Sequence, residues 1–192
     1  MKRDTPYAKA VEKLLNEFVA AVFGDHPPEK PLVVVVAGGA AVHLYTGARV
    51  SKDLDAEFLA RVLKPDVVVA YTDSDGTERT VHLDRTYTTT LGLLHEDYLD
   101  RSGLTGWTVP GLEVRVMSPV DLAISKLARW AEHDQADVRS LIDAGLLNRD
   151  SFERLANEAL SYFVGNTMPV RRSIEEALSM FPAPRAVKGA KP

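Results

Sequence analysis

The sequence predicts an α+β fold in which a mixed sheet with flanking helices is followed by a bundle of helices. Before Ser118, short runs of β-branched or alternating apolar residues are typical of strands. From Ser118 onward, apolar residues recur at helical spacing, and glycines and capping residues separate the segments. We therefore expect an α/β core over residues 1–117, a helical region over 118–181 and a disordered basic tail over 182–192.

The segments before residue 60 predict a helix, two strands and a second short helix. Three prolines separate the first helix from the first strand, and two adjacent glycines separate that strand from the short helix. The second strand alternates apolar residues with carboxylates, so that three acidic side chains share one face. The expected elements are a helix over 5–23, a strand over 32–36, a short helix over 40–46 and a strand over 53–59.

The later segments predict a hairpin, one more strand and four helices. The turn Asp73–Gly76 between two apolar runs is a hairpin signal. Ser118, Pro119 and the acid three residues after Ser118 resemble a capping box at a helix start, and Asp134 is the expected cap of the next helix. Residues 86–106 fit an irregular loop with a short helix. The expected strands cover 67–71, 77–83 and 112–116, and the expected helices cover 119–132, 135–144, 151–164 and 169–180.

The composition excludes several classes of site. The 192 residues contain no cysteine, which excludes disulfides, thiolate metal sites and a cysteine nucleophile. No apolar run approaches the roughly 18 residues that a membrane span requires, so we expect no membrane partner and a cytoplasmic location. The formal net charge of −4 argues against a protein that coats nucleic acid non-specifically, but it leaves room for a small basic surface beside an acidic metal site.

The most informative motif combines two glycines with two carboxylates. A buried strand runs into Gly38-Gly39, and a later strand places Asp53 and Asp55 at alternate positions. Alternate residues of a strand point to the same face, about 7 Å apart. Two aspartates on one face can hold Mg²⁺ together with substrate phosphates. Because adjacent glycines leave backbone N–H groups that a triphosphate can approach closely, the motif predicts a site for phosphoryl transfer.

This ordered set resembles the nucleotidyltransferase superfamily, whose fold is built around a DNA polymerase β-like palm. The resemblance covers about residues 30–150 and extends to three further segments. They are similar to a bacterial branch of small nucleotidyltransferases related to AbiEii-type and MenT-type toxins, which transfer nucleotides to the 3′ acceptor end of tRNA. These segments are Leu94–Leu99, Ser118–Arg129 and Asp134–Val138.

The resemblance implies roles for the residues of the glycine and aspartate motifs. Asp53 and Asp55 would hold one or two Mg²⁺ or Mn²⁺ ions that bridge the phosphates of a nucleoside triphosphate (NTP). Gly38 and Gly39 would let the backbone approach the β- and γ-phosphates. Ser51 could hydrogen-bond a phosphate, although a serine at this position could equally cap the strand.

Three residues of the helical region complete the implied site. The family match favours Lys126 as a triphosphate contact, with Arg129 one turn further on as a helper. A lysine on an apolar helix more commonly extends to solvent, which is the alternative for Lys126. Asp137 matches the second aspartate of the family's Asp-x-x-Asp motif and is a candidate catalytic residue. Its alternative is a solvated position near a helix N-terminus, where acidic residues are favourable in any case.

A third carboxylate is expected in superfamily members that activate a hydroxyl group. Asp84, which follows a predicted strand, is the candidate for this metal ligand. Glu57 shares the face of Asp53 and Asp55 but lies about 7 Å further along the strand. If neither carboxylate reached the metal, Asp137 would have to serve as the base, or the protein would be inactive.

The leading functional hypothesis is an Mg²⁺-dependent nucleotidyltransferase that acts on tRNA as the toxin of a toxin–antitoxin pair, with an antitoxin protein as its partner. One alternative is the same chemistry on a protein or a small hydroxylated molecule. Another is a binding module that has lost catalysis, which the two intact aspartates disfavour because neighbouring carboxylates repel each other. Local positive charge for RNA would come from Arg49, Lys52, Lys126, Arg129, Arg171, Arg172 and the tail.

Overall fold

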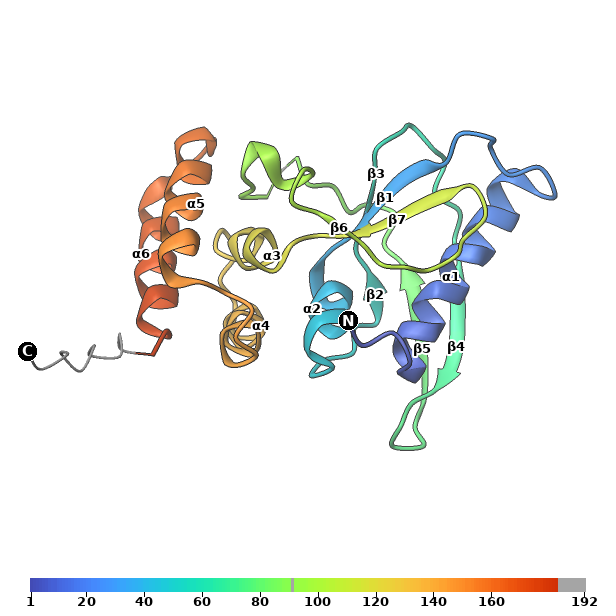
Figure 1. Ribbon diagram of the computed structural model, residues 1–192, viewed down its shortest axis with the longest axis horizontal. Helices are drawn as coiled ribbons and strands as arrows, with labels where there is room; N and C mark the ends of the chain where they lie inside the picture. The colour runs from blue at the N-terminus through green and yellow to red at the C-terminus, as the bar shows by residue number, and fades with distance from the viewer. Residues whose placement is uncertain (91, 183–192) are drawn as a thin grey trace, which may run out of the picture.

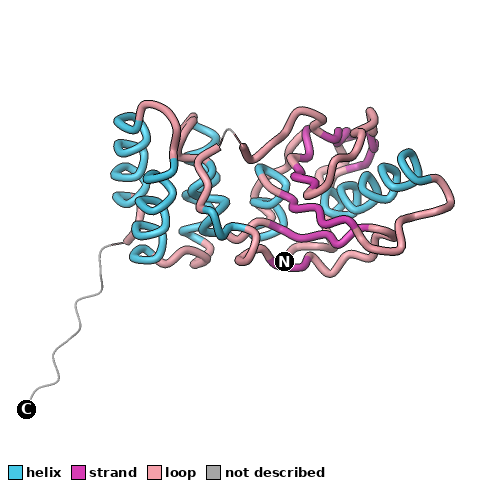
Figure 2. The backbone as a smooth tube through the Cα atoms, turned by 90° about the horizontal axis from the view of Figure 1, so that it is seen from above, coloured by secondary structure: helices cyan, strands magenta, loops and turns pink. Residues whose placement is uncertain are grey.

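The computed structural model describes residues 1–90 and 92–182, and its architecture is α+β as expected. Within these residues, two mixed sheets and six α-helices form the fold (Figure 1). The sheets and the first helix lie at one end of the molecule, and the last helices lie at the other (Figure 2). The tail predicted over 182–192 lies outside the described residues from residue 183 onward.

The first sheet carries the glycine motif at the end of a central strand. Its strands are, in order, β3 (Ala56–Phe58), β1 (Leu32–Val36), β7 (Leu112–Val116) and β6 (Gly103–Leu104). β1 runs parallel to β7 and antiparallel to β3, with Val34 opposite both Phe58 and Val114. β1 is a central strand whose backbone pairs on both sides, and its residues Val34, Val35 and Val36 are fully buried.

The second sheet packs against the first helix. Its strands are, in order, β2 (Asp53–Leu54), β5 (Glu78–Leu83) and β4 (Val68–Thr72), which confirms the predicted hairpin. Helix α1 (Pro6–Phe23) lies along β4 and β5 (Figure 1). The ring of Phe18 on α1 also lies 4.6 Å, centroid to centroid, from the ring of Phe58 in the first sheet. The buried face of α1 therefore packs against both sheets.

The strand predicted over 53–59 is two strands that belong to different sheets. The backbone N–H of Asp84 donates to the carbonyl of Leu54 at 3.0 Å, whereas the N–H of Ala37 donates to the carbonyl of Asp55 at 2.9 Å. Leu54 is thus tied to the second sheet and Asp55 to the first. The prediction of one continuous strand was wrong because the buried side chains keep their alternation across the break.

The helical region packs against the short helix that follows β1. This short helix is α2 (Gly38–Thr46), which begins two residues earlier than predicted, so the two glycines form its first turn. The remaining helices are α3 (Pro119–Ser125), α4 (Glu132–Asp143), α5 (Arg149–Tyr162) and α6 (Thr167–Ser179). Both α3 and α4 contact α2, and α5 packs between α3 and α6. This packing joins the two regions at the end of the first sheet.

The helix boundaries in this region differ from those predicted, most of all at the end of α3 and the start of α4. α3 ends at Ser125, seven residues earlier than expected, and residues 126–129 form a turn. α4 begins at Glu132 because the carboxylate of Asp134 accepts the backbone N–H of Ala131 at 3.1 Å. Asp134 was predicted to precede the helix, but it lies within its first turn, where an acid also satisfies a free N–H group.

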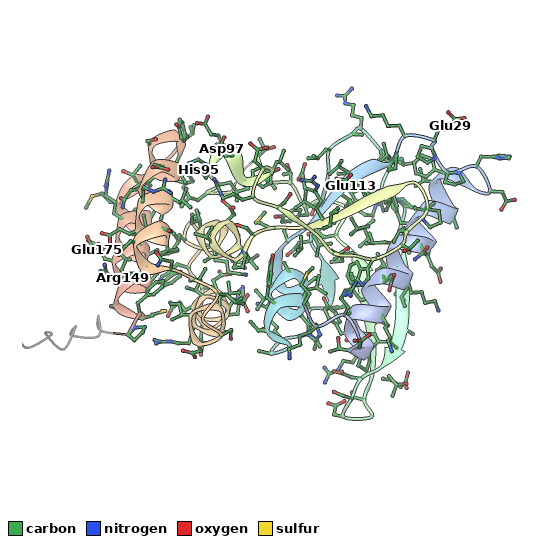
Figure 3. The ribbon with its side chains drawn as sticks, viewed as in Figure 1. Glu29, His95, Asp97, Glu113, Arg149 and Glu175 are labelled. Atoms are coloured by element: carbon green, nitrogen blue, oxygen red, sulfur yellow. The ribbon has the colours of Figure 1, made fainter. Side chains whose placement is uncertain are left out.

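The described residues of the loop predicted over 86–106 contain one short 3₁₀ helix, η1 (Glu96–Tyr98), and also the short strand β6, which the prediction missed. His95 precedes η1, and its Nδ1 accepts the backbone N–H of Asp97 at 3.1 Å (Figure 3). The other ring nitrogen of His95 lies 3.0 Å from the carboxylate of Glu158 on α5. These contacts attach the loop to the helical region. Among the helices of the described residues, none has the length and apolar character needed to cross a bilayer.

Candidate active site

A polar cavity of about 500 Å³ lies where the two sheets meet the helical region. Four segments form it: the first turn of α2, the segment 49–55 that includes β2, the loop after β5, and the segment 125–134 that joins α3 to α4. Its lining consists of Gly38, Gly39, Arg49, Ser51, Asp53, Asp55, Asp84, Tyr87, Thr88, Thr89, Gly92, Leu94, Ser125, Lys126, Ala128, Arg129, His133 and Asp134. Segments that are distant in sequence thus bring four carboxylates, those of Asp53, Asp55, Asp84 and Asp134, and three cations into one cavity.

The break between β2 and β3 places the aspartate motif at the cavity. Asp53 is exposed at the start of β2, and Asp55 is half-buried at the junction of the two sheets. Backbone hydrogen bonds from the first sheet and the second sheet fix the residues on either side of this junction. Both predicted metal ligands therefore lie on one rigid segment, with Asp84 beside them at the end of β5.

Asp55 has the most perturbed carboxylate of the three. Burial is the largest cause, followed by repulsion from Asp84, and together with repulsion from Asp53 they raise the pKa of Asp55 to about 6. The positive charges of Lys126 and Arg129 oppose this rise. A half-buried carboxylate that faces two others is a costly arrangement, of the kind that marks functional sites.

Asp84 is held in a fixed orientation by its own loop. Its Oδ1 accepts the backbone N–H and the hydroxyl of Thr86, at 2.7 and 2.8 Å, and the backbone N–H of Tyr87 at 3.1 Å. Burial would raise the pKa of Asp84, but these hydrogen bonds and the charge of Lys64 keep it below the usual value. The sequence-based choice of Asp84 thus corresponds to an ionised, oriented carboxylate on the same wall as the aspartate pair.

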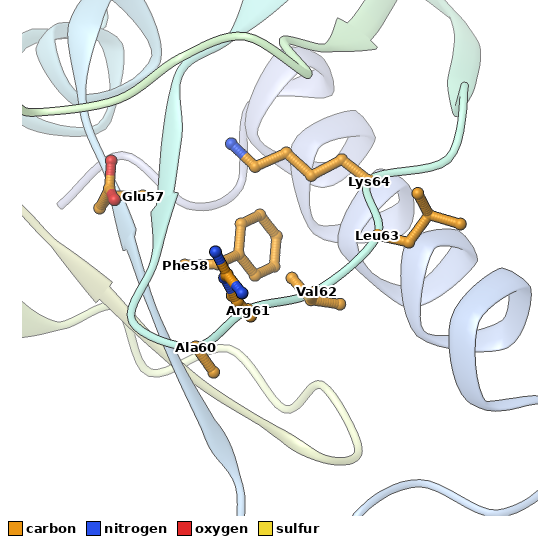
Figure 4. Close-up of a pocket in the computed structure, with 7 residues that line it drawn as sticks. All are labelled: Glu57, Phe58, Ala60, Arg61, Val62, Leu63 and Lys64. Carbon is orange, nitrogen blue, oxygen red and sulfur yellow. The ribbon is translucent and has the colours of Figure 1, made fainter.

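Glu57 does not join these carboxylates. It lines a separate cavity of about 380 Å³ beside the loop 60–64, where the side chains of Phe58 and Lys64 also lie (Figure 4). Its carboxylate accepts the backbone N–H of Thr89 at 2.9 Å. Glu57 follows Asp55 on the first sheet, with the buried Ala56 between them, but its carboxylate is not part of the polar cavity lining. Glu57 instead supports the loop that forms one side of the polar cavity.

Gly38 is required by the position of Asp55. Its φ of +54° lies in the left-handed region, and a Cβ atom on Gly38 would lie 1.7 Å from Oδ2 of Asp55. No side chain can occupy that space without moving the carboxylate. At Gly39 the approach is looser, since a Cβ atom would lie 3.0 Å from the Cβ of Ser51. The glycine pair therefore allows the helix start, Asp55 and Ser51 to meet at one point.

Replacing Gly38 by Ala should displace Asp55 and remove most of the activity. Gly24 is a matched control because its φ is +58° and nothing lies within 4 Å of the Cβ position. We expect Gly24→Ala to cost about 1–3 kcal/mol of unfolding free energy from its positive-φ backbone alone. Gly38→Ala should cost about 1–3 kcal/mol more. Urea unfolding of both variants measures the difference, and equal losses would contradict the observed packing.

The first turn of α2 gives the cavity an electropositive end. Its N-cap residue, Ala37, has no side-chain acceptor, so the first backbone N–H groups of this nine-residue helix are left for other partners. Gly38, Gly39 and Ser51 all line the cavity at this end. Backbone N–H groups and the helix dipole together favour a bound phosphate.

Lys126 lies inside the site and does not extend to solvent. It is the first residue after α3, its side chain is only 6% exposed, and its Nζ lies 2.7 Å from Oδ2 of Asp137. Oδ1 of Asp134 lies 3.7 Å from the same nitrogen. The alternative of a solvated lysine is wrong, because the turn after α3 directs the side chain toward α4.

Arg129 is the second cation that the turn presents. Its Nε and Nη2 donate to the two carboxylate oxygens of Asp134, each at 2.7 Å. This bidentate pair fixes the plane of the guanidinium, although the side chain is 66% exposed. Arg129 can therefore meet a ligand in the cavity while Asp134 holds its other edge.

Asp137 lies behind the cations and is not part of the cavity lining. Its carboxylate pairs with both Lys126 and Arg49, and its side chain is only 4% exposed. The alternative of a solvated helix N-terminus is therefore wrong. A catalytic role for Asp137 stays a prediction, whereas its contacts fit a residue that positions two cations.

The sequence argument missed Arg49 as a residue of this site and counted it only as general positive charge. Arg49 follows α2 and reaches Asp137 across the cavity wall. His43 fixes its backbone, because Nδ1 of His43 donates to the Arg49 carbonyl at 2.5 Å while Nε2 lies 2.7 Å from the Thr5 hydroxyl. Burial keeps the pKa of His43 below the usual value, which favours this neutral ring. A histidine six residues before an arginine is no recognisable motif, so only the fold reveals the contact.

The carboxylates fit a metal that is shared with a substrate. Among the described residues, no three histidine, aspartate or glutamate side chains converge closely enough to form a complete metal site. Asp53, Asp55 and Asp84 nevertheless line the same cavity, where burial and then repulsion from the other two carboxylates raise the pKa of Asp55. Mg²⁺ commonly takes one or two protein carboxylates and completes its shell with phosphate oxygens and water. The donor set suits that arrangement better than a closed protein site.

Comparisons with known proteins agree with this chemistry at the level of the family. A solved structure of an antigenic nucleotidyltransferase-like protein from Paracoccidioides brasiliensis is 15% identical, with 96% of this chain and 99% of that chain covered and a TM-score of 0.41. That likeness is too distant to bear on function. A comparison with curated proteins found no match. The model of a family described as nucleotidyltransferase of unknown function matches residues 12–175, and the chain therefore belongs to this nucleotidyltransferase family.

Proposed function

We propose that this protein is an Mg²⁺-dependent nucleotidyltransferase that moves a nucleoside monophosphate from an NTP to a hydroxyl group. The observation that carries the proposal is a single cavity lined by the carboxylates of Asp53, Asp55 and Asp84 together with the first turn of α2 and Lys126. Carboxylates suit the metal of a metal–nucleotide complex, and N–H groups and cations suit its phosphates. Both halves of such a ligand thus have their partners in one place.

The phosphates would lie between the first turn of α2 and the turn after α3. Gly38 and Gly39 contribute backbone N–H groups, and the Ser51 hydroxyl lies beside them. Lys126 and Arg129 contribute positive charge that is already oriented by Asp137 and Asp134. Cations held in place before the substrate arrives stabilise charge that develops on the transferred group without reorganisation.

The transfer would be a displacement at the α-phosphorus. The oxygen of the acceptor hydroxyl forms a bond to that phosphorus, the bond to the β-phosphate oxygen breaks, and pyrophosphate leaves. The carboxylate of Asp84 would accept the proton of the acceptor hydroxyl, since hydrogen bonds from Thr86 and Tyr87 fix the orientation of that carboxylate. A metal held by Asp53 and Asp55 would supply charge neutralisation of the phosphates. Lys126 and Arg129 would offset the charge on the leaving pyrophosphate.

We further propose RNA, and first the 3′ end of tRNA, as the acceptor. The support is the resemblance of the segments around Lys126 and Asp137 to AbiEii-type and MenT-type toxins. A toxin of this kind would have a cognate antitoxin protein as its partner. Transfer to a protein or to a small hydroxylated molecule would be a different outcome of the same assay.

The test is to incubate the purified protein with Mg²⁺, each labelled NTP in turn, and total tRNA. We expect label in tRNA with one preferred NTP and none with Asp53→Asn or without Mg²⁺. Label in the protein itself, or in added small hydroxylated molecules, would show that the acceptor is one of these and not RNA. No transfer to any acceptor by a folded protein that binds Mg²⁺ would refute the proposed activity.

A further inference from the structure

The turn that carries Lys126 and Arg129 ends in a strained residue. Trp130 has a φ of +50°, and among the described residues no other non-glycine residue has a positive φ. A bulky aromatic residue is rarely found in this region of the backbone map. Such a conformation persists only where surrounding contacts hold it. The contacts of Trp130 therefore indicate what keeps the turn in place.

Three hydrogen bonds hold Trp130, and the third comes from a distant helix. Its backbone N–H donates to the carbonyl of Lys126 at 2.9 Å, and its carbonyl accepts the side-chain amide of Gln135 at 3.2 Å. Its indole Nε1–H donates to Oε2 of Glu176 at 2.7 Å. Glu176 lies on α6, which contributes no described residue to the cavity lining. The indole thus connects the last helix to the turn.

We propose that Trp130 and Glu176 are positioning residues, through which α6 holds the turn that presents Lys126 and Arg129 to the nucleotide. This inference rests on the proposed function, because it assigns those two cations to phosphate binding. A charge-assisted hydrogen bond to the indole fixes the ring, and the ring fixes the strained backbone at the end of the turn. The C-terminal helix is then part of the active site's support even though it never touches the substrate.

The chain offers a matched control on the same helix. Glu175 and Glu176 are adjacent, acidic and exposed, and Figure 3 shows Glu175 on α6. Replacing either glutamate by Ala removes one negative charge and changes the intrinsic helix propensity at one exposed position of α6 by the same amount. Glu176→Gln keeps an oxygen that can accept the indole N–H. Trp130→Phe keeps an aromatic ring but removes the N–H donor together with part of the indole, so it should show at least the effect of Glu176→Ala.

The experiment compares each variant with the wild type in two measurements on the full chain. The first is the dependence of transfer on NTP concentration, and the second is the NMR spectrum. We expect Glu176→Ala and Trp130→Phe each to raise the KM for the NTP about 3–10-fold, with kcat within twofold of the wild type. The double variant should be no worse than Trp130→Phe alone, because both remove one contact. Glu176→Gln should retain most of the affinity, and Glu175→Ala should match the wild type.

The NMR measurement is independent of catalysis. The chain has two tryptophans, so its spectrum contains two indole N–H signals. In Glu176→Ala the Trp130 indole signal and the backbone amides of residues 126–131 should shift, and in Glu175→Ala they should not. Unmoved signals in Glu176→Ala, or equal effects of Glu175→Ala and Glu176→Ala, would overturn the inference. A wild-type protein that transfers no nucleotide would refute the proposed function instead, while the amide shifts would still decide whether α6 holds the turn.

Discussion

Replacing Asp55 by Asn should abolish nucleotidyl transfer and at the same time stabilise the protein in the absence of metal. Asp55 is half-buried beside Asp84, and its pKa is raised from 3.8 to about 6. Near neutral pH its carboxylate is ionised in a place that disfavours the charge. The isosteric amide removes that charge, so we expect a gain of about 1–3 kcal/mol in unfolding free energy, at roughly 1.4 kcal/mol per pKa unit. Activity should fall at least 10³-fold, since removing a preorganised charge commonly costs about that much.

The pH dependence has a definite sign. Because the folded-state pKa of Asp55 lies above the unfolded-state value, the folded protein binds more protons than the unfolded chain between about pH 4 and pH 6. Stability contributed by this group therefore falls as the pH rises through that window. The difference in melting temperature between Asp55→Asn and the wild type should be near zero at pH 4 and should reach its plateau above about pH 7.

Asp53 provides the control for this prediction. It belongs to the same motif but is exposed, so Asp53→Asn should remove activity without a comparable gain in stability. Melting curves in chelator and in Mg²⁺ measure both effects. A destabilised Asp55→Asn protein, or one that still transfers nucleotide, would contradict the assignment of Asp55 to a charged active-site wall.

The sequence was a good guide to the glycine and aspartate motifs because their signals are local. A β-branched run, two glycines and alternating carboxylates each follow from backbone preferences within a few residues. The sheet change at Asp55 was hidden because Leu54, Ala56 and Phe58 stay buried on both sides of it. Alternation reports which side chains are covered, and it does not report which sheet covers them.

The cation half of the site could not be derived in the same way. Apolar periodicity after Ser118 continues past Ser125, and nothing local indicates that Trp130 adopts a positive φ. The burial of Lys126 depends on Asp137, eleven positions later on another helix, and Arg49 meets that same carboxylate from the end of α2. Only the resemblance to a family pointed to Lys126. Long-range ion pairs of this kind leave no periodic trace in a sequence.

Replacing Lys126 by Met should destabilise the protein strongly, because it leaves Asp137 and Asp134 with one partner fewer in a buried place. We expect a loss of about 2–4 kcal/mol, somewhat below the usual cost of breaking a buried pair because Arg49 and Arg129 remain. Lys13→Met is the control: Lys13 pairs with Glu17 at 3.8 Å, and its side chain is 64% exposed. An exposed pair of this kind should contribute less than about 0.5 kcal/mol. Urea unfolding at pH 7 measures both losses, and equal values would contradict the buried arrangement.

The double variant Lys126→Met/Asp137→Leu separates the fold from the function. When both partners become apolar, neither charge is left buried without the other, and Arg49, with 32% of its side chain exposed, can turn to water. Replacing a whole buried pair by apolar residues is often neutral for stability. We therefore expect the double variant to recover at least half of the stability lost by Lys126→Met and yet to transfer no nucleotide. Recovery of stability without activity would mean that the buried charges are kept for the substrate, because packing alone does not require them.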